Sequence, residues 1–369
     1  MAVLGAGSLP FTPFLFPRFG GKWGRVKGTR GELLPHRKRT VTSTLIHQAH
    51  CEMGRLLDGE WITADLGTDA QGRFVRRATT FRGKISADGS SGFPAVAGRY
   101  HLYISNACGW SHRCLIIRRL KGLEDAISVS FVQPFMGMEN GWTLAEGADA
   151  VNGKTKLWEV YVAAQSDYTG RASVPVLWDK ETKTIVSNES LDIAKALDRE
   201  FDSIAGNPSL HLFPDELQVD VDKMVAANYD PVNNGVYKCG FAGNQEAHEE
   251  ASRALFKRLD ELEELLGKQR YLLGQRLTVA DWYLFTTLYR FDAVYYCHFK
   301  CNLKRIVDYP NLWGFTRELY QIPGVAETCN MDEIKQHYYT SHESIHPRRY
   351  VPIGPEIDFD QPHGRDRFG

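Results

Sequence analysis

The chain has 369 residues, enough for two domains that each bury a core of their own. Its 44 Lys and Arg nearly balance its 45 Asp and Glu, so nothing in the charge suggests a nucleic-acid-binding protein. No run of about eighteen apolar residues predicts a transmembrane helix. The seven cysteines are scattered and show no CxxC spacing, which argues against a disulfide scaffold or a zinc site and indicates a reducing compartment.

The N-terminal leader, residues 1–50, differs in composition from the rest of the chain. Its first 31 residues contain no Asp or Glu and several Arg and Lys. Such a leader resembles an organellar transit peptide, and a disordered basic tail is the alternative. We therefore expect a cytoplasmic protein, or one of a plastid or mitochondrion if the leader is a transit peptide.

After the leader, residues 51–98 carry many glycines and little periodicity, which predicts an irregular extension wrapped on the first domain. Residues 99–205 follow a clearer pattern. Alternation over 100–105 predicts a strand, helical spacing over 113–123 a helix, and ISVSF at 127–131 a second strand parallel to the first. A hairpin over 174–186 and a helix from about Ser190 complete the β-α-β-β-β-α order of a thioredoxin-like domain.

Helical periodicity dominates residues 215–345, which predicts an all-helical second domain. Within it, Thr278 and Asp281 have the spacing of a capping box at a helix start. Residues 346–369 are rich in Pro and Gly and predict an extended tail. The fold class is thus α/β plus all-α, a thioredoxin-like domain followed by a helical one.

Cys108 is the candidate nucleophile because it lies between the first predicted strand and the first helix, in NACGWSHR. A thiol at a helix N-terminus meets the positive end of the dipole, and such an environment favours the reactive thiolate. His112 and Arg113 are expected to add positive charge nearby. A buried structural cysteine is the alternative, and the place in the fold argues against it.

Two further segments are predicted to meet this thiol. Val174 precedes Pro175 at the start of a strand, and we expect a cis bond there that leaves the Val174 backbone free to pair with a peptide. Glu189 and Ser190 stand at a helix start, which suits a carboxylate ligand and an ammonium group. Simple helix capping is the alternative for this pair.

The sequence resembles the glutathionyl-hydroquinone reductases, or Xi-class glutathione transferases, from about residue 53 to residue 363. The matching segments include RYHLYISNACGWSHR, ENGW, DYTGR, VPVLWDK, TIVSNES, VYKCGFA, FTTLYRFDAVYYCHFKCN and HYYTSH. The block around FKCN and the HYY segment are specific. Omega-class transferases share only the cysteine turn, the VPVL strand and the Glu-Ser pair.

The resemblance implies a set of roles and partners. Glutathione and glutathionyl-hydroquinone would be the substrates, with no metal, and a homodimer would form through the helical domain. Cys108 would be the nucleophile, with Tyr237 and Tyr338 assisting at the aromatic acceptor. The remaining binding positions would be Trp142, Val174, Glu189, Ser190 and Tyr339, the last in the acceptor pocket. The cluster of His337, His342 and His346 has spacings that do not suit a metal site.

The chain departs from the family pattern in two places. The nucleophile turn usually reads CPWA, whereas residues 108–111 read CGWS, and glycine loosens a position that proline preorganises. Ser111 adds a hydroxyl that is able to donate to the thiolate. Relatives also usually carry a basic residue on the helix before DYTGR that meets glutathione, and residues 157–168 contain none, with Trp158 in that region.

The expected reaction is attack of Cys108 on the sulfur of a glutathionyl-hydroquinone, followed by resolution of the mixed disulfide by a second glutathione. Two other classes stay open. One is an omega-like thiol transferase or dehydroascorbate reductase, which would lack the HYY and FKCN segments. The other is a non-enzymatic interaction module on the transferase fold, which would not need a cysteine at the turn.

Overall fold

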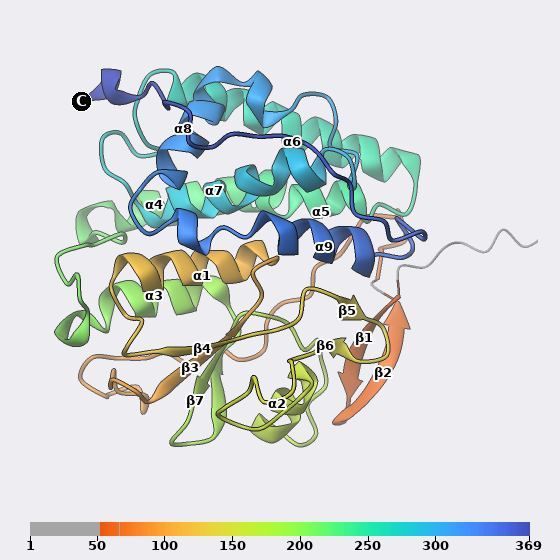
Figure 1. Ribbon diagram of the computed structural model, residues 1–369, viewed down its shortest axis with the longest axis vertical. Helices are drawn as coiled ribbons and strands as arrows, with labels where there is room; N and C mark the ends of the chain where they lie inside the picture. The colour runs from red at the N-terminus through yellow and green to blue at the C-terminus, as the bar shows by residue number, and fades with distance from the viewer. Residues whose placement is uncertain (1–51, 66) are drawn as a thin grey trace, which may run out of the picture. The chain divides into compact units, whose positions relative to one another are not determined.

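The computed structural model describes residues 52–65 and 67–369 (Figure 1). The predicted leader, residues 1–50, and Cys51 lie outside the described residues. The first domain has the following strands and helices in chain order: β1 (Glu52–Leu57), β2 (Glu60–Asp65), β3 (Tyr100–Ile104), α1 (Gly109–Leu120), β4 (Ser128–Phe131), β5 (Met136–Gly137), β6 (Gly141–Trp142), α2 (Leu157–Ala164), β7 (Val176–Asp179), β8 (Thr184–Ser187) and α3 (Ser190–Arg199).

The central sheet has the strand order β4-β3-β7-β8. Strands β3 and β4 are parallel, β7 runs antiparallel to β3, and β8 runs antiparallel to β7. This is the predicted order of a parallel β-α-β unit followed by a hairpin and a helix, and the thioredoxin-like prediction is confirmed. Helix α1 ends at Leu120, earlier than the expected residue 123, because Gly122 adopts a φ of +63° that an α-helix does not continue through.

The period-two pattern of the strands divides the domain into two apolar layers. Tyr100, Leu102 and Ile104 of β3 face the core that α1 and α3 share with the helical domain. Tyr103 of β3 and Trp178 of β7 face a second core that α2 covers. In Figure 1, α1 and α3 accordingly lie between the sheet and the helices above it, and α2 lies below.

The second domain is helical, as expected. Its helices in the described chain are α4 (Gln218–Asn228), α5 (Gly235–Gly240), α6 (Gln245–Leu266), α7 (Val279–Arg290), α8 (Pro310–Tyr320) and α9 (Met331–Ser341). The predicted capping box at the start of α7 is present, since the Asp281 carboxylate accepts from the Thr278 amide at 2.8 Å. The same carboxylate accepts from Leu272 at 2.8 Å, which joins the preceding loop to the helix.

The prediction of an irregular extension over residues 51–98 was wrong for its first part. Strands β1 and β2 form an antiparallel hairpin in which Leu57 pairs with Glu60. The two residues between them, Asp58 and Gly59, have φ values of +51° and +82°. Asp-Gly is a sequence that favours such a two-residue turn, so the signal for this hairpin was present in the chain.

The rest of the extension contacts both domains, not the first alone. On one side it joins the sheet, where Gly83 donates to Val186 of β8 at 2.8 Å. On the other side it joins the helical domain, where Gly243 donates to Gly72 at 2.7 Å and Phe74 packs on Phe241 with ring centres 5.4 Å apart. Residues 67–98 therefore bridge the two domains along one edge.

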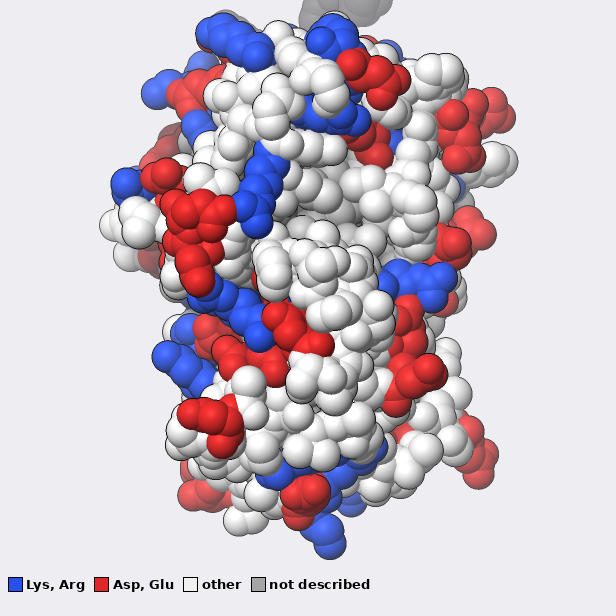
Figure 2. Space-filling view, turned by 90° about the vertical axis from the view of Figure 1, so that its left-hand side faces the viewer, with Lys and Arg blue, Asp and Glu red and all other residues white. Residues whose placement is uncertain are grey.

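The face of the molecule shown in Figure 2 carries charges of both signs. On the side shown in Figure 2, acidic and basic side chains alternate around a broad uncharged area. This agrees with the near-zero balance of charged residues. Among the described helices, none combines the length and the apolar character that a bilayer span requires.

The C-terminal tail is largely without regular structure, as expected, but one buried arginine fixes its end. Arg365 is 1% exposed, and its Nε donates to the Glu318 carboxylate of α8 at 3.0 Å. Its Nη atoms donate to the carbonyl oxygens of Leu266 and Gln269 at 3.1 and 2.9 Å. The guanidinium thus satisfies the C-terminal end of α6, where a cation is favoured.

We predict that Arg365→Met lowers the free energy of unfolding by about 3 kcal/mol, because it leaves a buried carboxylate and two carbonyls short of donors. Arg367→Met is the matched control, since that side chain is exposed and the change should cost less than about 0.5 kcal/mol. Urea denaturation of both variants measures the difference. Equal losses would show that the tail is not held by Arg365.

Candidate active site

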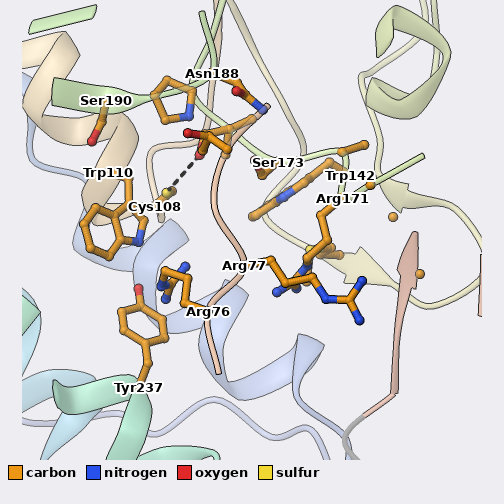
Figure 3. Close-up of a pocket in the computed structure, with 18 of the residues that line it drawn as sticks. Arg76, Arg77, Cys108, Trp110, Trp142, Arg171, Ser173, Asn188, Ser190 and Tyr237 are labelled. Carbon is orange, nitrogen blue, oxygen red and sulfur yellow. Dashed lines mark hydrogen bonds between the residues drawn. The ribbon is translucent and has the colours of Figure 1, made fainter. Parts of the chain in front are cut away.

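Cys108 caps the N-terminus of α1 and its half-buried side chain opens on a cavity of about 530 Å³. The residue is extended, with φ −79° and ψ 120°, so the helix begins directly after it. Its Sγ lies 3.7 Å from the Val174 carbonyl oxygen, which Figure 3 marks with a dashed line. The structure therefore places the predicted nucleophile at a helix start, facing a pocket.

A buried arginine of the helical domain holds the turn before Cys108. Arg290, at the end of α7, donates from Nε to the Ala107 carbonyl and from Nη2 to the Asn106 carbonyl, both at 2.9 Å. Its Nη1 lies 3.0 Å from Nδ1 of His112. The sequence analysis gave Arg290 no role, although an arginine among the apolar residues of α7 was a visible signal.

The expectation that His112 adds positive charge was wrong. Burial and the neighbouring Arg290 hold the pKa of His112 well below its usual range, so the ring is neutral. Its Nε2 lies 3.0 Å from the Thr328 hydroxyl. Arg113 does bring a cation near the turn, with its guanidinium packed on the rings of Trp110 and Tyr283 at 4.3 and 3.6 Å.

The residues predicted to hold glutathione meet on one side of the cavity. Val174, Glu189, Ser190 and Trp142 all line it together with Cys108. The Val174–Pro175 bond is cis, as expected. Glu189 does cap α3, accepting from the Leu191 amide at 3.3 Å, and its other oxygen accepts from the Thr79 hydroxyl at 3.1 Å, so the capping interpretation and the pocket position are both realised.

The opposite wall is aromatic and belongs to the helical domain. Tyr237 of α5 and Tyr338 of α9 line the cavity, and their hydroxyl groups are 2.6 Å apart. The Tyr338 hydroxyl also lies 3.1 Å from that of Tyr295. Burial raises the pKa of Tyr338 well above its usual range, so its hydroxyl is a neutral hydrogen-bonding group.

Tyr339 does not line the pocket, which corrects the sequence-based expectation. Its buried hydroxyl donates to the Ala293 carbonyl at 3.1 Å, and its ring packs on His298. Successive residues of an α-helix point about 100° apart, so neighbours on α9 face different surroundings. The HYY segment therefore contributes Tyr338 to the cavity and Tyr339 to the core.

The histidines of α9 serve the wall of the pocket. His337 stacks on Trp142 with ring centres 4.7 Å apart, and its Nδ1 lies 2.9 Å from the Pro134 carbonyl oxygen. Burial lowers the pKa of His337 to about 4, so it is neutral. His342 lies 3.1 Å from His298, and His346 contacts Tyr350. The described residues contain no group arranged as a metal site.

Three arginines of the pocket were missed by the sequence analysis. Arg76 and Arg77 come from the extension and Arg171 from the segment before β7. Figure 3 shows Arg77 and Arg171 beside Trp142, whereas Arg76 lies near Tyr237. These cations are the described basic residues that border the cavity, while Trp158, noted where relatives carry a basic residue, instead stacks on Trp61 with ring centres 6.1 Å apart.

Of the cysteines in the described ranges, Cys108 is the one that borders the cavity. Burial raises the pKa of Cys114 and of Cys301, and that of Cys329 to about 12. Cys297 is exposed but lies away from the pocket lining. In the described residues the cavity is therefore lined by a single thiol, between the side that holds Val174, Glu189 and Ser190 and an aromatic side.

Comparison with known proteins places this geometry in a family. Residues 107–200 match the model described as glutathione S-transferase, N-terminal domain, and residues 245–318 match its C-terminal counterpart. The glutathionyl-hydroquinone reductase YqjG of Escherichia coli is 49% identical over 86% of this chain and 100% of its own. The chain belongs to the glutathionyl-hydroquinone reductases, the Xi class of glutathione transferases.

Solved structures of this class have the same fold. A Xi-class transferase of Natrialba magadii has a TM-score of 0.80 and 48% identity, over 86% of this chain and 98% of that one. The glutathione-bound structure of YqjG has a TM-score of 0.78 and 47% identity, over 85% of this chain and 99% of that one. Both domains of this Xi-class chain are therefore covered by structural relatives.

The two noted features of the nucleophile turn have plain structural consequences in this Xi-class protein. Gly109 is the first residue of α1, and a Cβ built on it would come no closer than 3.8 Å to the Thr286 hydroxyl. Ser111 is buried, and its hydroxyl accepts from the Ser105 amide at 3.3 Å, away from the cavity lining. The turn thus has room for the family's proline.

We predict that Gly109→Pro raises the free energy of unfolding by about 0.4 to 1 kcal/mol, because proline restricts the unfolded chain. The first amide of a helix has no acceptor within it, and Cys108 already has the extended conformation that proline demands of its predecessor. Gly122→Pro is the control, and it should destabilise because the φ of Gly122 is +63°. Chemical denaturation compares them, and a loss at Gly109 would contradict the geometry.

Proposed function

We propose that this protein reduces glutathionyl-hydroquinones to hydroquinones with glutathione as the reductant, and that Cys108 is the nucleophile. The observation that carries the proposal is the position of one half-buried thiol between two unlike walls of a single cavity. One wall has the groups that suit a γ-glutamyl peptide, and the other has rings and tyrosine hydroxyls that suit a quinol. The name of the YqjG relative and its glutathione-bound structure support the same substrates.

On the peptide side, the Val174 backbone is proposed to pair with the cysteinyl unit of glutathione. Ser190 and the start of α3 would hold the γ-glutamyl carboxylate, where free amides and the helix dipole favour an anion. The Glu189 carboxylate would meet the ammonium group. Trp142, fixed by its stacking on His337, would pack against the peptide.

The reaction has two steps. The Cys108 thiolate attacks the sulfur of the conjugate, a disulfide forms between Cys108 and glutathione, and the ring carbon, which must take a proton, loses its bond to sulfur. Tyr237 and Tyr338 would hold the quinol oxygens during this step. A second glutathione then attacks the mixed disulfide, which releases oxidised glutathione and regenerates the thiolate.

The HYY and FKCN segments and the YqjG relative favour this reaction over that of an omega-like thiol transferase. Tyr338 belongs to the HYY segment and lines the cavity, on the side proposed to bind the aromatic acceptor. The same proposal includes a homodimer through the helical domain, and a location in the cytoplasm, or in a plastid or mitochondrion if residues 1–50 are a transit peptide. Light scattering and a fluorescent fusion of the full chain would test them.

Cys108→Ser is expected to abolish reductase activity while glutathione binding survives, because the peptide-binding groups remain. Cys297→Ser, at the exposed cysteine, is the matched control and should keep full activity. Oxidised glutathione should add one glutathione to the unmutated protein at Cys108, as located by peptide mapping. Substantial turnover by the Cys108 variant, or an adduct at another cysteine, would assign the chemistry elsewhere.

Tyr338→Phe is expected to lower turnover of a glutathionyl-hydroquinone about ten-fold, the scale of one lost hydrogen bond to a polar transition state. Turnover of 2-hydroxyethyl disulfide should change little, because that substrate has no quinol oxygen. Tyr339→Phe removes a hydroxyl from the next residue, which faces the core, and should leave both rates unchanged. Equal losses on both substrates at Tyr338 would indicate a packing role.

A further inference from the structure

Arg76 is held in one place on the wall of the cavity that the extension supplies. Its guanidinium carbon lies 5.0 Å from the ring centre of Trp110 and 4.8 Å from that of Tyr237. Its Nε donates to the Asn234 side-chain oxygen at 2.7 Å. Two aromatic faces and one hydrogen bond therefore fix the cation before a ligand arrives.

No carboxylate of the described residues lies within ion-pair distance of this guanidinium, although other arginines of the extension have such partners. Arg73 pairs with Glu250 and Arg82 with Asp192. Glu189 lines the same cavity, but its oxygens accept from Thr79 and Leu191. A half-buried cation without a counter-charge has lost hydration that one hydrogen bond and the aromatic faces replace only in part, so the position suits an anionic oxygen of a ligand.

The position of Arg76 in the cavity indicates which oxygen of the conjugate it would contact. Figure 3 shows it between Cys108 and Tyr237, on the aromatic side, whereas Ser190 and Asn188 mark the peptide side. A conjugate whose glutathione part occupies the peptide side has its ring near Trp110 and Tyr237. We propose that Arg76 is a further catalytic residue, which binds the quinol oxygen adjacent to the carbon–sulfur bond and stabilises the negative charge that develops there. This inference rests on the proposed function.

The charge follows from the balance of the first step. In the tautomer in which the sulfur-bearing carbon has taken the proton of the neighbouring quinol hydroxyl, that oxygen is a ketone. Thiolate attack forms the sulfur–sulfur bond, and the electron pair of the carbon–sulfur bond moves into the ring and onto the oxygen. The cysteine sulfur is oxidised, the ring carbon is reduced, and hydroquinone leaves as a phenolate that takes a proton from water. A fixed cation at that oxygen lowers the barrier without reorganising.

The first test compares two substrates. Arg76→Met keeps an unbranched side chain but removes its guanidinium charge, and should lower kcat for a glutathionyl-hydroquinone about 100-fold, the scale of one lost oxyanion donor. The rate with 2-hydroxyethyl disulfide should stay within about three-fold, because its leaving group is a thiolate with no ring oxygen. Arg73→Met, an exposed arginine of the same segment, is the matched control and should change neither rate.

The second test varies the ring. The substrates are a series of conjugates whose phenol groups are progressively less acidic. The fold-decrease in kcat caused by Arg76→Met should grow along this series, because the hydroquinone becomes a poorer leaving group. Arg76→Lys restores a charge without the planar fork and should recover part of the loss. A uniform loss across the series, or no recovery by lysine, would assign Arg76 a structural role.

An equilibrium measurement covers the cases in which turnover is absent or the Met variant does not fold. With p-nitrophenol as the probe and Cys108→Ser as the protein, bound probe should show the phenolate absorbance at lower pH than free probe. Adding Arg76→Met to this protein should abolish the shift in the pH at which the phenolate absorbance appears. Arg76→Gln replaces Arg76→Met if circular dichroism shows that the latter is unfolded. An unchanged shift overturns the inference. If the wild type reduces no glutathionyl-hydroquinone, the proposed function fails, and the probe result still decides whether Arg76 binds a phenolate.

Discussion

The hydrogen bonds from Arg290 to the two carbonyl groups before Cys108 are the constraint on which the site depends. The nucleophile belongs to the thioredoxin-like domain, but the group that fixes its turn belongs to the helical domain. Arg290 is fully buried, and its donors also meet the Thr286 carbonyl and the neutral ring of His112. Because these groups satisfy the buried guanidinium, the turn before Cys108 is restricted to one conformation. Any shift would leave a buried charge or a buried carbonyl group without a hydrogen-bond partner.

Three parts of the chain, distant in sequence, then build the cavity around that fixed thiol. The thioredoxin-like domain supplies the side with Val174, Glu189 and Ser190, α5 and α9 supply the aromatic side, and the extension closes the edge between them. The extension is able to do so because it is hydrogen-bonded to β8 at Gly83 and to the helical domain at Gly72. Each part contributes groups of a different chemistry, so one pocket presents both charged and aromatic groups around the thiol.

The differences from the sequence-based expectations have specific physical reasons. Glycine-rich composition made the extension look irregular, yet Asp58-Gly59 forms the two-residue turn of a hairpin. Adjacent tyrosines on α9 looked equivalent, yet helical geometry sends Tyr338 to the cavity and Tyr339 to the core. His112 looked like a source of charge, yet burial beside Arg290 keeps it neutral.

Local patterns in the chain were sufficient for the two-domain fold, the order of elements in the central sheet, the capping box at Thr278 and the position of Cys108 at a helix start. These features depend on residues close together in sequence, whose periodicity and turn chemistry are written in the chain. The arginines of the pocket and the clamp on the nucleophile turn were decided only by the tertiary structure. Arg290 lies more than 180 residues from the carbonyls it binds. Such a contact leaves no local periodicity, since it arises when two separately patterned domains bury a shared face.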